Sequence, residues 1–341
     1  MDLMYEAATI HRKYHNPNEV QVSTLLSIKT GGCPEDCAYC PQAARYHTDI
    51  EKNEMMSVQE VKAKALRAKE AGSSRMCMGA AWRNVKDGRD FEQVLEMVRT
   101  INKLNMEVCC TLGMITENQA RRLAEAGLYA YNHNIDTSND YYDKVISTRS
   151  YGDRLKTIKN VRKTNITVCS GGIIGMGERL EDRAKMLITL SRLDPHPESV
   201  PINALVPVEG TPLENQHCVE IWEMIRMIAT TRVVLPQTQV RLSAGRNEMS
   251  KEGQTMCFFA GANSIFAGDK LLTTPNPDIG EDMKLFQKLG ITVQKPFMKR
   301  DQPKTVEKED SKLESLGEKP KWSRPKKIKE NNQMEESSLR N

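Results

Sequence analysis

Between residues 20 and 290, segments typical of β-strands alternate regularly with segments typical of α-helices. The expected strands cover residues 20–28, 75–79, 107–112, 130–135, 167–174, 200–206, 239–243 and 263–266. The expected helices cover residues 57–71, 90–104, 116–127, 151–163, 178–192, 216–235 and 278–289. Eight β–α units in this length predict an α/β fold, a (β/α)8 TIM-type barrel, with a doubly wound open sheet as the alternative.

Composition divides the chain into three parts. Residues 1–19 are predicted to form an N-terminal helical segment, and residues 20–298 the barrel domain. Residues 299–341 carry 12 Lys or Arg and 9 Asp or Glu but few apolar residues. Such a segment buries too little apolar surface to offset its ordering entropy, so we expect a disordered basic tail. A solubilising role is the simple interpretation of this tail, and targeting or interaction is the alternative.

Charge and hydropathy favour a protein that acts on small molecules. The formal net charge of the 341 residues is +4, and the tail holds most of it. A nearly neutral body predicts no nucleic-acid partner. No apolar run approaches the roughly 18 residues that a membrane span needs, and the first residues lack the apolar core of a secretory signal. We expect a cytoplasmic location, or the mitochondrial matrix if a transit segment is missing from this chain.

Three cysteines follow the first expected strand with the spacing C-x3-C-x2-C: Cys33, Cys37 and Cys40. In a barrel, active sites lie on the loops at the carboxyl ends of the strands. Structural zinc sites and most four-iron clusters have four protein ligands, so three thiolates leave one metal open to a substrate. A zinc site that uses His47 as the fourth ligand is the alternative, although its distance along the chain is unusual.

A second set of cysteines is dispersed over three expected strands: Cys77, Cys109 and Cys169. Each alone is more typical of a small buried apolar residue. Together with Arg241, in a fourth strand, they suggest a ligand set inside the barrel, because a buried guanidinium needs an electron-rich partner. Nine cysteines in a chain of this length that is expected to be intracellular indicate metal or redox chemistry instead of a disulfide framework.

Polar residues gather at further strand ends. They are Asn132, Asn134, Asp136, Asn203, Thr273 and Thr274. Amides and hydroxyls can hold a neutral ureido group or a carboxylate without competing for a metal, although turn and capping roles are the alternative. The glycines of SGGIIGMGE, residues 170–178, could admit a nucleotide close to the backbone or mark an ordinary strand–helix turn.

The cysteine loop, with Tyr39 inside it, resembles the signature of the radical S-adenosylmethionine superfamily. Longer strings resemble the biotin synthase family within it, over about residues 3–291. They are STLLSIKTGGCPEDCAYCPQ, MCMGAAW, YNHNIDTS, VCSGGIIGMGE, SVPINALVPVEGTPL, VRLSAGR and FFAGANSIFAGDKLLTTPNP.

The resemblance implies a role for each set of residues. Cys33, Cys37 and Cys40 would hold a 4Fe-4S cluster whose open iron binds S-adenosylmethionine. Cys77, Cys109, Cys169 and Arg241 would hold a 2Fe-2S cluster. Tyr39, Asn134, Asp136 and Arg154 would bind the S-adenosylmethionine, and Asn132, Asn203, Thr273 and Thr274 would bind dethiobiotin. No side chain would act as an acid–base catalyst, because the cofactors carry the chemistry.

The implied reaction is the last step of biotin biosynthesis. S-adenosylmethionine is cleaved to a 5′-deoxyadenosyl radical, which abstracts hydrogen from dethiobiotin so that sulfur from the two-iron cluster can be inserted. Implied partners are an electron donor such as flavodoxin or ferredoxin, the iron–sulfur assembly machinery and a second subunit in a homodimer. Three departures from the family stand out: a short N-terminus, a basic tail without a recognised counterpart, and an extra thiol, Cys110, which could compete as a ligand. The alternatives are another radical enzyme of this superfamily with a different small substrate, and a non-catalytic iron–sulfur or zinc redox sensor.

Overall fold

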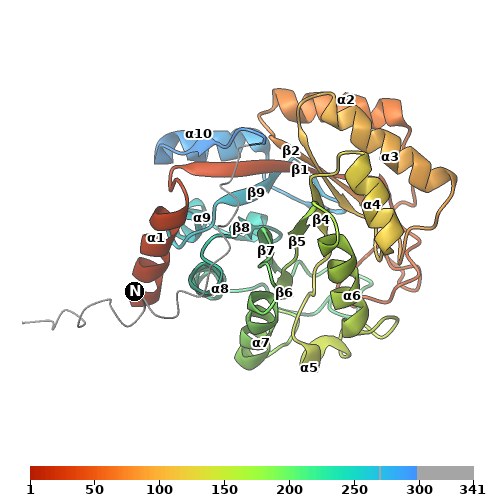
Figure 1. Ribbon diagram of the computed structural model, residues 1–341. Coiled ribbons are helices and arrows are strands. Elements are labelled where there is room, and N and C mark those ends of the chain that lie inside the picture. Colours follow the sequence, from red (N-terminus) through yellow and green to blue (C-terminus); the bar gives the residue numbers. More distant parts are fainter. Residues whose placement is uncertain (269, 298–341) are drawn as a thin grey trace, which may run out of the picture. The chain divides into compact units, whose positions relative to one another are not determined.

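The computed structural model describes residues 1–268 and 270–297. The expected basic tail, residues 299–341, lies outside the described residues. Within them, parallel strands form a closed ring with helices packed outside it (Figure 1). The predicted (β/α)8 barrel is confirmed and the open sheet is excluded, because the first strand pairs with both the second strand and the last strand of the ring.

The ring has eight strand positions. In order they are β1 (Glu19–Lys29), β2 (Arg75–Ala80), β3 (Glu107–Thr111), β4 (Ala130–Asn132), β5 (Thr167–Cys169) continued by β6 (Gly172–Ile174), β7 (Ser199–Ala204), β8 (Gln239–Leu242) and β9 (Ser264–Ala267). A short strand, β12 (Thr292–Val293), pairs with the beginning of β1. The segment after it contacts the barrel interior, where the Phe297 amide donates to Glu107 at 2.9 Å, so this segment covers the amino-terminal end of the barrel.

Helices fill the connections. They are α1 (Asp2–Tyr14), α2 (Val58–Glu70), α3 (Arg89–Asn102), α4 (Glu117–Glu125), α5 (Asn139–Tyr142), α6 (Tyr151–Arg162), α7 (Leu180–Ser191), α8 (Ile221–Val234), a 3₁₀ turn η1 (Arg246–Glu248), α9 (Lys251–Phe259) and α10 (Ile279–Leu289). Helices α2 and α4 begin with the two capping boxes that the sequence predicts, Ser57 with Glu60 and Thr116 with Gln119. Each box satisfies amide groups that an isolated helix start would leave unpaired.

Several elements differ from the sequence prediction. The strand expected at 167–174 is broken into β5 and β6, and the helix expected from 216 begins at Ile221. Helices α5 and α9 were not expected, nor was the hairpin of β10 (Lys270–Leu271) and β11 (Thr274–Pro275). These elements are short, so hydrophobic periodicity gives little signal for them.

Apolar side chains pack on both faces of the strand ring, outside it and inside it. The larger cluster lies between the strands and the helices and includes Met76, Val108 and Cys110. A small cluster lies inside the barrel and includes Cys77, Cys109 and Phe266. Since neighbouring residues of a strand point to opposite faces, this separation follows from strand geometry. Beside this small cluster, buried polar side chains such as Gln21, Ser23, Arg241 and Ser264 occupy the barrel interior.

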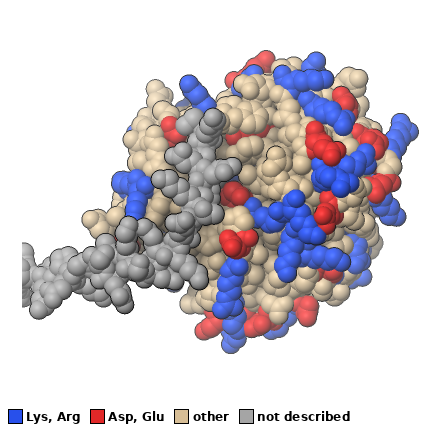
Figure 2. All heavy atoms as spheres, in the orientation of Figure 1, with Lys and Arg blue, Asp and Glu red and all other residues tan. Residues whose placement is uncertain are grey.

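No helix among residues 1–268 and 270–297 is long and apolar enough to cross a membrane. On the face shown in Figure 2, Lys and Arg are interspersed with Asp and Glu.

A buried ion pair fixes α10 to the barrel, and its removal tests the fold. Arg246 and Asp282 are both buried, and Arg246 also donates to the carbonyl of Phe266 at 2.8 Å. Asp282→Ala leaves the guanidinium buried without its counter-charge, so we expect a loss of about 3–5 kcal/mol in unfolding free energy. Urea unfolding measures it.

The neighbouring Glu281 provides the control. Its ion pairs with Lys251 and Lys284 are on the surface, so Glu281→Ala should leave the unfolding midpoint unchanged within error. Equal effects of the two substitutions would contradict this account of α10.

Candidate functional site

The loop that carries the first cysteine trio follows β1, at the carboxyl end of the barrel. It folds back on itself: the Cys33 amide donates to the Gln42 carbonyl at 2.9 Å, and the Cys40 amide donates to the Cys37 carbonyl at 2.9 Å. Backbone bonds thus hold the three thiols on one compact turn. This is the placement that the C-x3-C-x2-C spacing predicts.

Asp36 attaches this loop to the rest of the barrel. Its carboxylate accepts from the amides of Ser147 and Thr148 at 2.9 and 3.1 Å, and Arg45 pairs with it at 3.1 Å. Burial opposes the charged form, but the hydrogen bonds from Ser147 and Thr148 outweigh it and lower the pKa of Asp36 to about 2. Asp36, which lies between Cys33 and Cys37, therefore anchors the cysteine loop to a segment 111 residues further along the chain.

Burial governs the chemistry of the three thiols. It raises the pKa of Cys33 and Cys37, and it raises the pKa of Cys40 to about 12, with a further contribution from Cys37 and Cys33. The thiols are therefore protonated at neutral pH until a metal displaces the protons. Ligation will release protons, so cluster binding should weaken as the pH falls.

Three thiols on one loop are a donor set of the kind that an iron–sulfur cluster takes. Among residues 1–268 and 270–297, no three His, Cys, Asp or Glu side chains form a group that could hold a metal ion. A four-iron cluster needs something different, one thiolate at each of three separate irons, and three thiols on one loop supply that. His47, the alternative zinc ligand, is exposed.

The second set meets inside the barrel. Cys77 and Cys109 are register partners on β2 and β3, and Arg241 Nη1 lies 3.8 Å from Cys169 Sγ. A hydrogen bond with the Cys109 thiol, assisted by Arg241 and Arg75, lowers the pKa of Cys77 to about 7. The structure thus brings together the four residues that the sequence placed on four different strands.

Polar neighbours hold Arg241 in place. It is fully buried, and it donates to Ser264 Oγ at 2.9 Å, to Gln21 Oε1 at 3.1 Å and to Ser23 Oγ at 3.4 Å. Its guanidinium lies 4.4 Å from the centre of the Phe266 ring. This cradle fixes the side chain with one edge toward the cysteines.

Cys110 faces the opposite way from Cys109. It packs in the layer between strands and helices, and burial raises its pKa. The expectation that Cys110 could compete as a ligand is wrong, because adjacent residues of a strand point to opposite faces.

A connected group of polar side chains links the cysteine loop to the end of β4. Tyr39 donates to Asp136 Oδ2 at 2.8 Å, and Arg154 forms a buried ion pair with the same carboxylate. Arg154 also donates to the Asn134 carbonyl at 2.8 Å and to Tyr142 at 2.9 Å. The hydrogen bonds of the described residues use Oδ2 of Asp136, so its Oδ1 can accept from a ligand.

Asn132 lies between the two sets of residues. Its amide nitrogen is 3.2 Å from Cys169 Sγ and 3.2 Å from Asn134 Oδ1, while Thr111 donates to its amide oxygen at 3.2 Å. One side chain thus contacts both the interior cysteines and the Asp136 segment.

The other residues predicted to bind substrate are less closely connected. Asn203 donates to the Gly172 carbonyl at 2.9 Å and accepts from the Ala244 amide at 3.3 Å. Thr273 and Thr274 lie in the β10–β11 hairpin, where both bond to the Leu271 carbonyl. The two threonines bond only within their own hairpin, and none of these described hydrogen bonds joins Asn203, Thr273 or Thr274 to Asn132.

The glycines after β5 have a packing role. A Cβ on Gly171 would come within 2.0 Å of the Pro201 carbonyl oxygen, and one on Gly172 within 2.5 Å of the Asp136 carbonyl oxygen. These close approaches are to the chain itself, so they support the strand-turn interpretation over the nucleotide interpretation.

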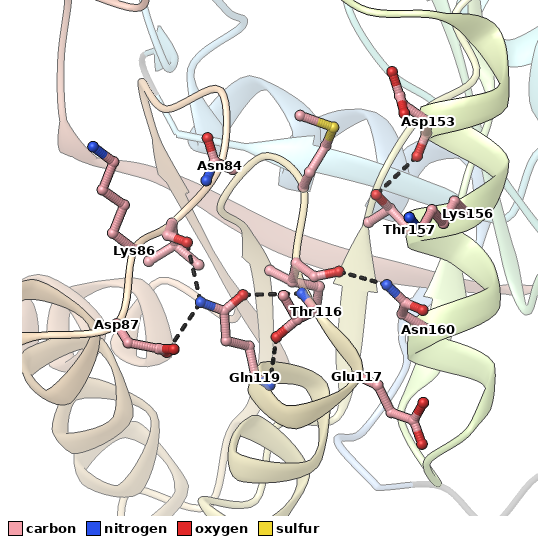
Figure 3. A pocket seen from close by; sticks show the side chains of 13 residues that line it. Asn84, Lys86, Asp87, Thr116, Glu117, Gln119, Asp153, Lys156, Thr157 and Asn160 are labelled. Carbon is pink, nitrogen blue, oxygen red and sulfur yellow. Dashed lines mark hydrogen bonds between the residues drawn. The ribbon is translucent and has the colours of Figure 1, made fainter.

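A cavity of about 710 Å³ opens between the loops after β2 and β3 and helix α6 (Figure 3). It contains none of the cysteines. Its amides are used to tie the loops together: Gln119 donates to Val85 and Asp87, and Asn160 donates to the Ile115 carbonyl at 2.8 Å. The cavity is therefore a junction between loops that stands outside the thiol sites.

Three residues packed in or against the cysteine loop escaped the sequence reasoning: Asp36, Glu35 and Arg149. The first two lie within the cysteine loop, which was a usable signal. Their partners, around residue 148, are distant in sequence, and nothing in the spacing points to them.

Comparison with known proteins adds the family. Residues 27–190 match the Radical SAM superfamily, and residues 201–292 match the Biotin and Thiamin Synthesis associated domain. The biotin synthase of Flavobacterium psychrophilum is 78% identical over 325 residues, which cover 95% of this chain and 90% of that protein. The biotin synthase of Flavobacterium johnsoniae is 77% identical with the same coverage.

Solved structures share the fold. Methylornithine synthase (PylB) superposes with a TM-score of 0.72 at 20% identity, over 86% of this chain and 88% of that one. The FeFe-hydrogenase maturase HydG from Carboxydothermus hydrogenoformans gives a TM-score of 0.75 at 14% identity, over 86% of this chain and 71% of that one.

The anchor at Asp36 makes a prediction about pH. Its carboxylate has a lowered pKa, so its stabilising contribution is complete above about pH 4 and is lost as the pH falls through 2. Asp36→Asn should therefore destabilise the apoprotein by on the order of 2 kcal/mol at pH 6, and this difference from the wild type should shrink between pH 4 and pH 2. Urea unfolding across this range measures it.

Asp49, an exposed residue of the same loop, gives the matched control. Asp49→Asn should leave the stability unchanged. If the difference in unfolding free energy between the wild type and Asp36→Asn stays constant from pH 6 to pH 2, the proposed anchor is contradicted.

Proposed function

The chain belongs to the biotin synthase family, within the radical S-adenosylmethionine superfamily, and we propose that the residues described above organise its reaction as follows. The activity is insertion of sulfur into dethiobiotin to form biotin, with S-adenosylmethionine as the source of the radical. A redox partner must supply the electron; we propose a flavodoxin or a ferredoxin. The homodimer and the cytoplasmic location stay predictions.

Cys33, Cys37 and Cys40 are proposed to hold the 4Fe-4S cluster, and Cys77, Cys109, Cys169 and Arg241 the 2Fe-2S cluster. When bound, the first supplies an electron to S-adenosylmethionine and the second supplies sulfur to the substrate. The protein's part is to place these two sites at a fixed separation, on the loop after β1 and inside the barrel. The compact loop supports the first assignment, and the pairing of Cys77 with Cys109 supports the second.

Tyr39, Asn134, Asp136 and Arg154 are proposed to bind S-adenosylmethionine. Asp136, with one free carboxylate oxygen, suits the hydroxyls of a ribose, and Tyr39 connects it to the cysteine loop. Arg154 holds Asp136 in position, and its remaining N–H groups can donate to a carboxylate of the ligand. Fixing the ligand in one orientation is how such a site guides a reactive species to one target.

The observation that carries the proposal is the position of Asn132. It contacts Cys169 in the interior set and Asn134 in the nucleoside set. A substrate bound by this amide would lie between the radical source and the sulfur donor, as sulfur insertion requires. Asn203 and the hairpin threonines are proposed to complete the dethiobiotin site.

Burial of the site has a chemical purpose. Cys77, Cys109 and Cys169 have almost no exposure to solvent, and Tyr39 packs against the core. Exclusion of water and of other hydrogen donors protects a carbon radical from side reactions.

The direct test of the function is an assay of the full chain, reconstituted anaerobically with iron and sulfide. With a reductant, S-adenosylmethionine and dethiobiotin, we expect 5′-deoxyadenosine and biotin. Formation of 5′-deoxyadenosine that does not depend on dethiobiotin would favour another substrate, and its complete absence would favour a non-catalytic protein.

Two cysteine variants separate the two proposed clusters. Cys37→Ala should abolish 5′-deoxyadenosine formation, because it removes a ligand of the site that cleaves S-adenosylmethionine. Cys169→Ala should retain cleavage and lose biotin formation, because it affects only the sulfur donor. Both products are measured by liquid chromatography of the same reaction.

Cys218 is exposed and belongs to neither set, so Cys218→Ala is the control and should keep both activities. Full biotin yield from the Cys169→Ala protein would refute the role proposed for that residue.

A further inference from the structure

A buried ion pair joins Glu35, inside the cysteine loop, to Arg149, and neither side chain has a part in the roles described so far. Arg149 Nε and Glu35 Oε1 are 3.8 Å apart, with side chains only 8% and 3% exposed. Arg149 Nη2 lies 3.9 Å from the Sγ atom of Cys37. A cation and an anion are thus packed next to a thiol that is proposed to ligate the four-iron cluster.

This ion pair is incompletely satisfied. Arg149 Nε and Glu35 Oε1 are both buried and, among the described residues, neither has a hydrogen-bond partner. Their separation is too long for a hydrogen bond between them. Buried charges are costly unless they are fully paired, so the guanidinium retains capacity to interact with another electron-rich group. Cys37 Sγ is such a group within reach.

Arg154 provides a contrast. It also lies close enough to Cys37 to influence it, but its charge is met by Asp136 in a close ion pair. The charge of Arg149 is balanced more loosely, because Glu35 is also shared with Thr148 and with Arg83 at 3.5 Å. Arg149 is also the guanidinium that contacts the Cys37 sulfur directly, because the described hydrogen bonds of Arg154 go to Tyr142, Asn134 and Asp136.

We propose that Arg149 and Glu35 are positioning residues that set, in opposite directions, the reduction potential of the cluster held by Cys33, Cys37 and Cys40. This inference rests on the proposed function. One-electron reduction adds a negative charge to the cluster and neither forms nor breaks a bond. A cation next to a ligand sulfur favours the reduced form, whereas a neighbouring carboxylate disfavours it.

The test is a redox titration of the reconstituted full chain. Dithionite is the reductant, and electron paramagnetic resonance follows the signal of the reduced four-iron cluster. We expect Arg149→Gln to lower the equilibrium constant for reduction about tenfold, which is about 59 mV for one electron. Arg149→Lys, which keeps the charge, should stay within about threefold of the wild type. Glu35→Gln should raise the constant.

Arg83 supplies the matched control, because it pairs with the same Glu35 but is 41% exposed. Solvent screens an exposed charge, so Arg83→Gln should shift the potential much less than Arg149→Gln. A merely structural role would not give opposite shifts for Arg149→Gln and Glu35→Gln. Shifts in the same direction, or none in either variant, would overturn the proposal.

Three further outcomes each have a definite meaning. If Arg149→Gln does not retain iron, the direction of the Glu35→Gln shift decides: a rise supports the proposal and a fall or no change overturns it. A wild-type chain that binds no four-iron cluster refutes the proposed function as well. A wild type that binds the cluster and cleaves S-adenosylmethionine, with a potential indifferent to Arg149, refutes this inference alone.

Discussion

Everything in the site depends on the closure of the parallel ladder between β1 and β9. Closure directs alternate residues of every strand toward one axis, so side chains that are far apart in sequence meet at the same height. Cys77 and Cys109 become neighbours on adjacent strands, and Cys169 on β5 reaches Arg241 on β8 past the intervening strand β7. An open sheet of the same strands would spread these four residues along a surface, where no single cluster could join them.

Burying charged and polar side chains inside the barrel costs desolvation free energy, and the chain offsets this cost by pairing its buried charges. Arg75 and Glu107 form a buried ion pair at 2.7 Å. They are paired across β2 and β3, two residues before the pair of Cys77 and Cys109. Arg241 is surrounded by hydroxyl and amide acceptors. Replacing a buried ion pair by well-packed apolar residues is often neutral or stabilising, so these pairs add little to the stability of the fold. The outer layer, between strands and helices, supplies the apolar packing that the interior gives up.

The sequence was sufficient for the barrel because eight strands and most of their helices follow clear periodicities. It also predicted that Cys33, Cys37 and Cys40 lie on one loop after the first strand, while their role as cluster ligands stays a prediction. It could not decide which of Cys109 and Cys110 faces inward, since one register step exchanges the two faces. Nor could it show that Asp36 binds Ser147 and Thr148, or that Arg149 lies beside Cys37, because these contacts join loops of different β–α units. Short elements such as α9 and the β10–β11 hairpin escaped for a simpler reason: they are too brief to show a period.

The central claim is that three thiolates on one loop leave a single iron free to bind S-adenosylmethionine. Mössbauer spectroscopy of the full chain, reconstituted anaerobically with ⁵⁷Fe, tests it most directly. The account predicts that adding S-adenosylmethionine changes the signal of one iron in the four-iron cluster and leaves the other three as they were. Spectra that do not respond to S-adenosylmethionine, or a chain that takes up zinc and no iron, would contradict it.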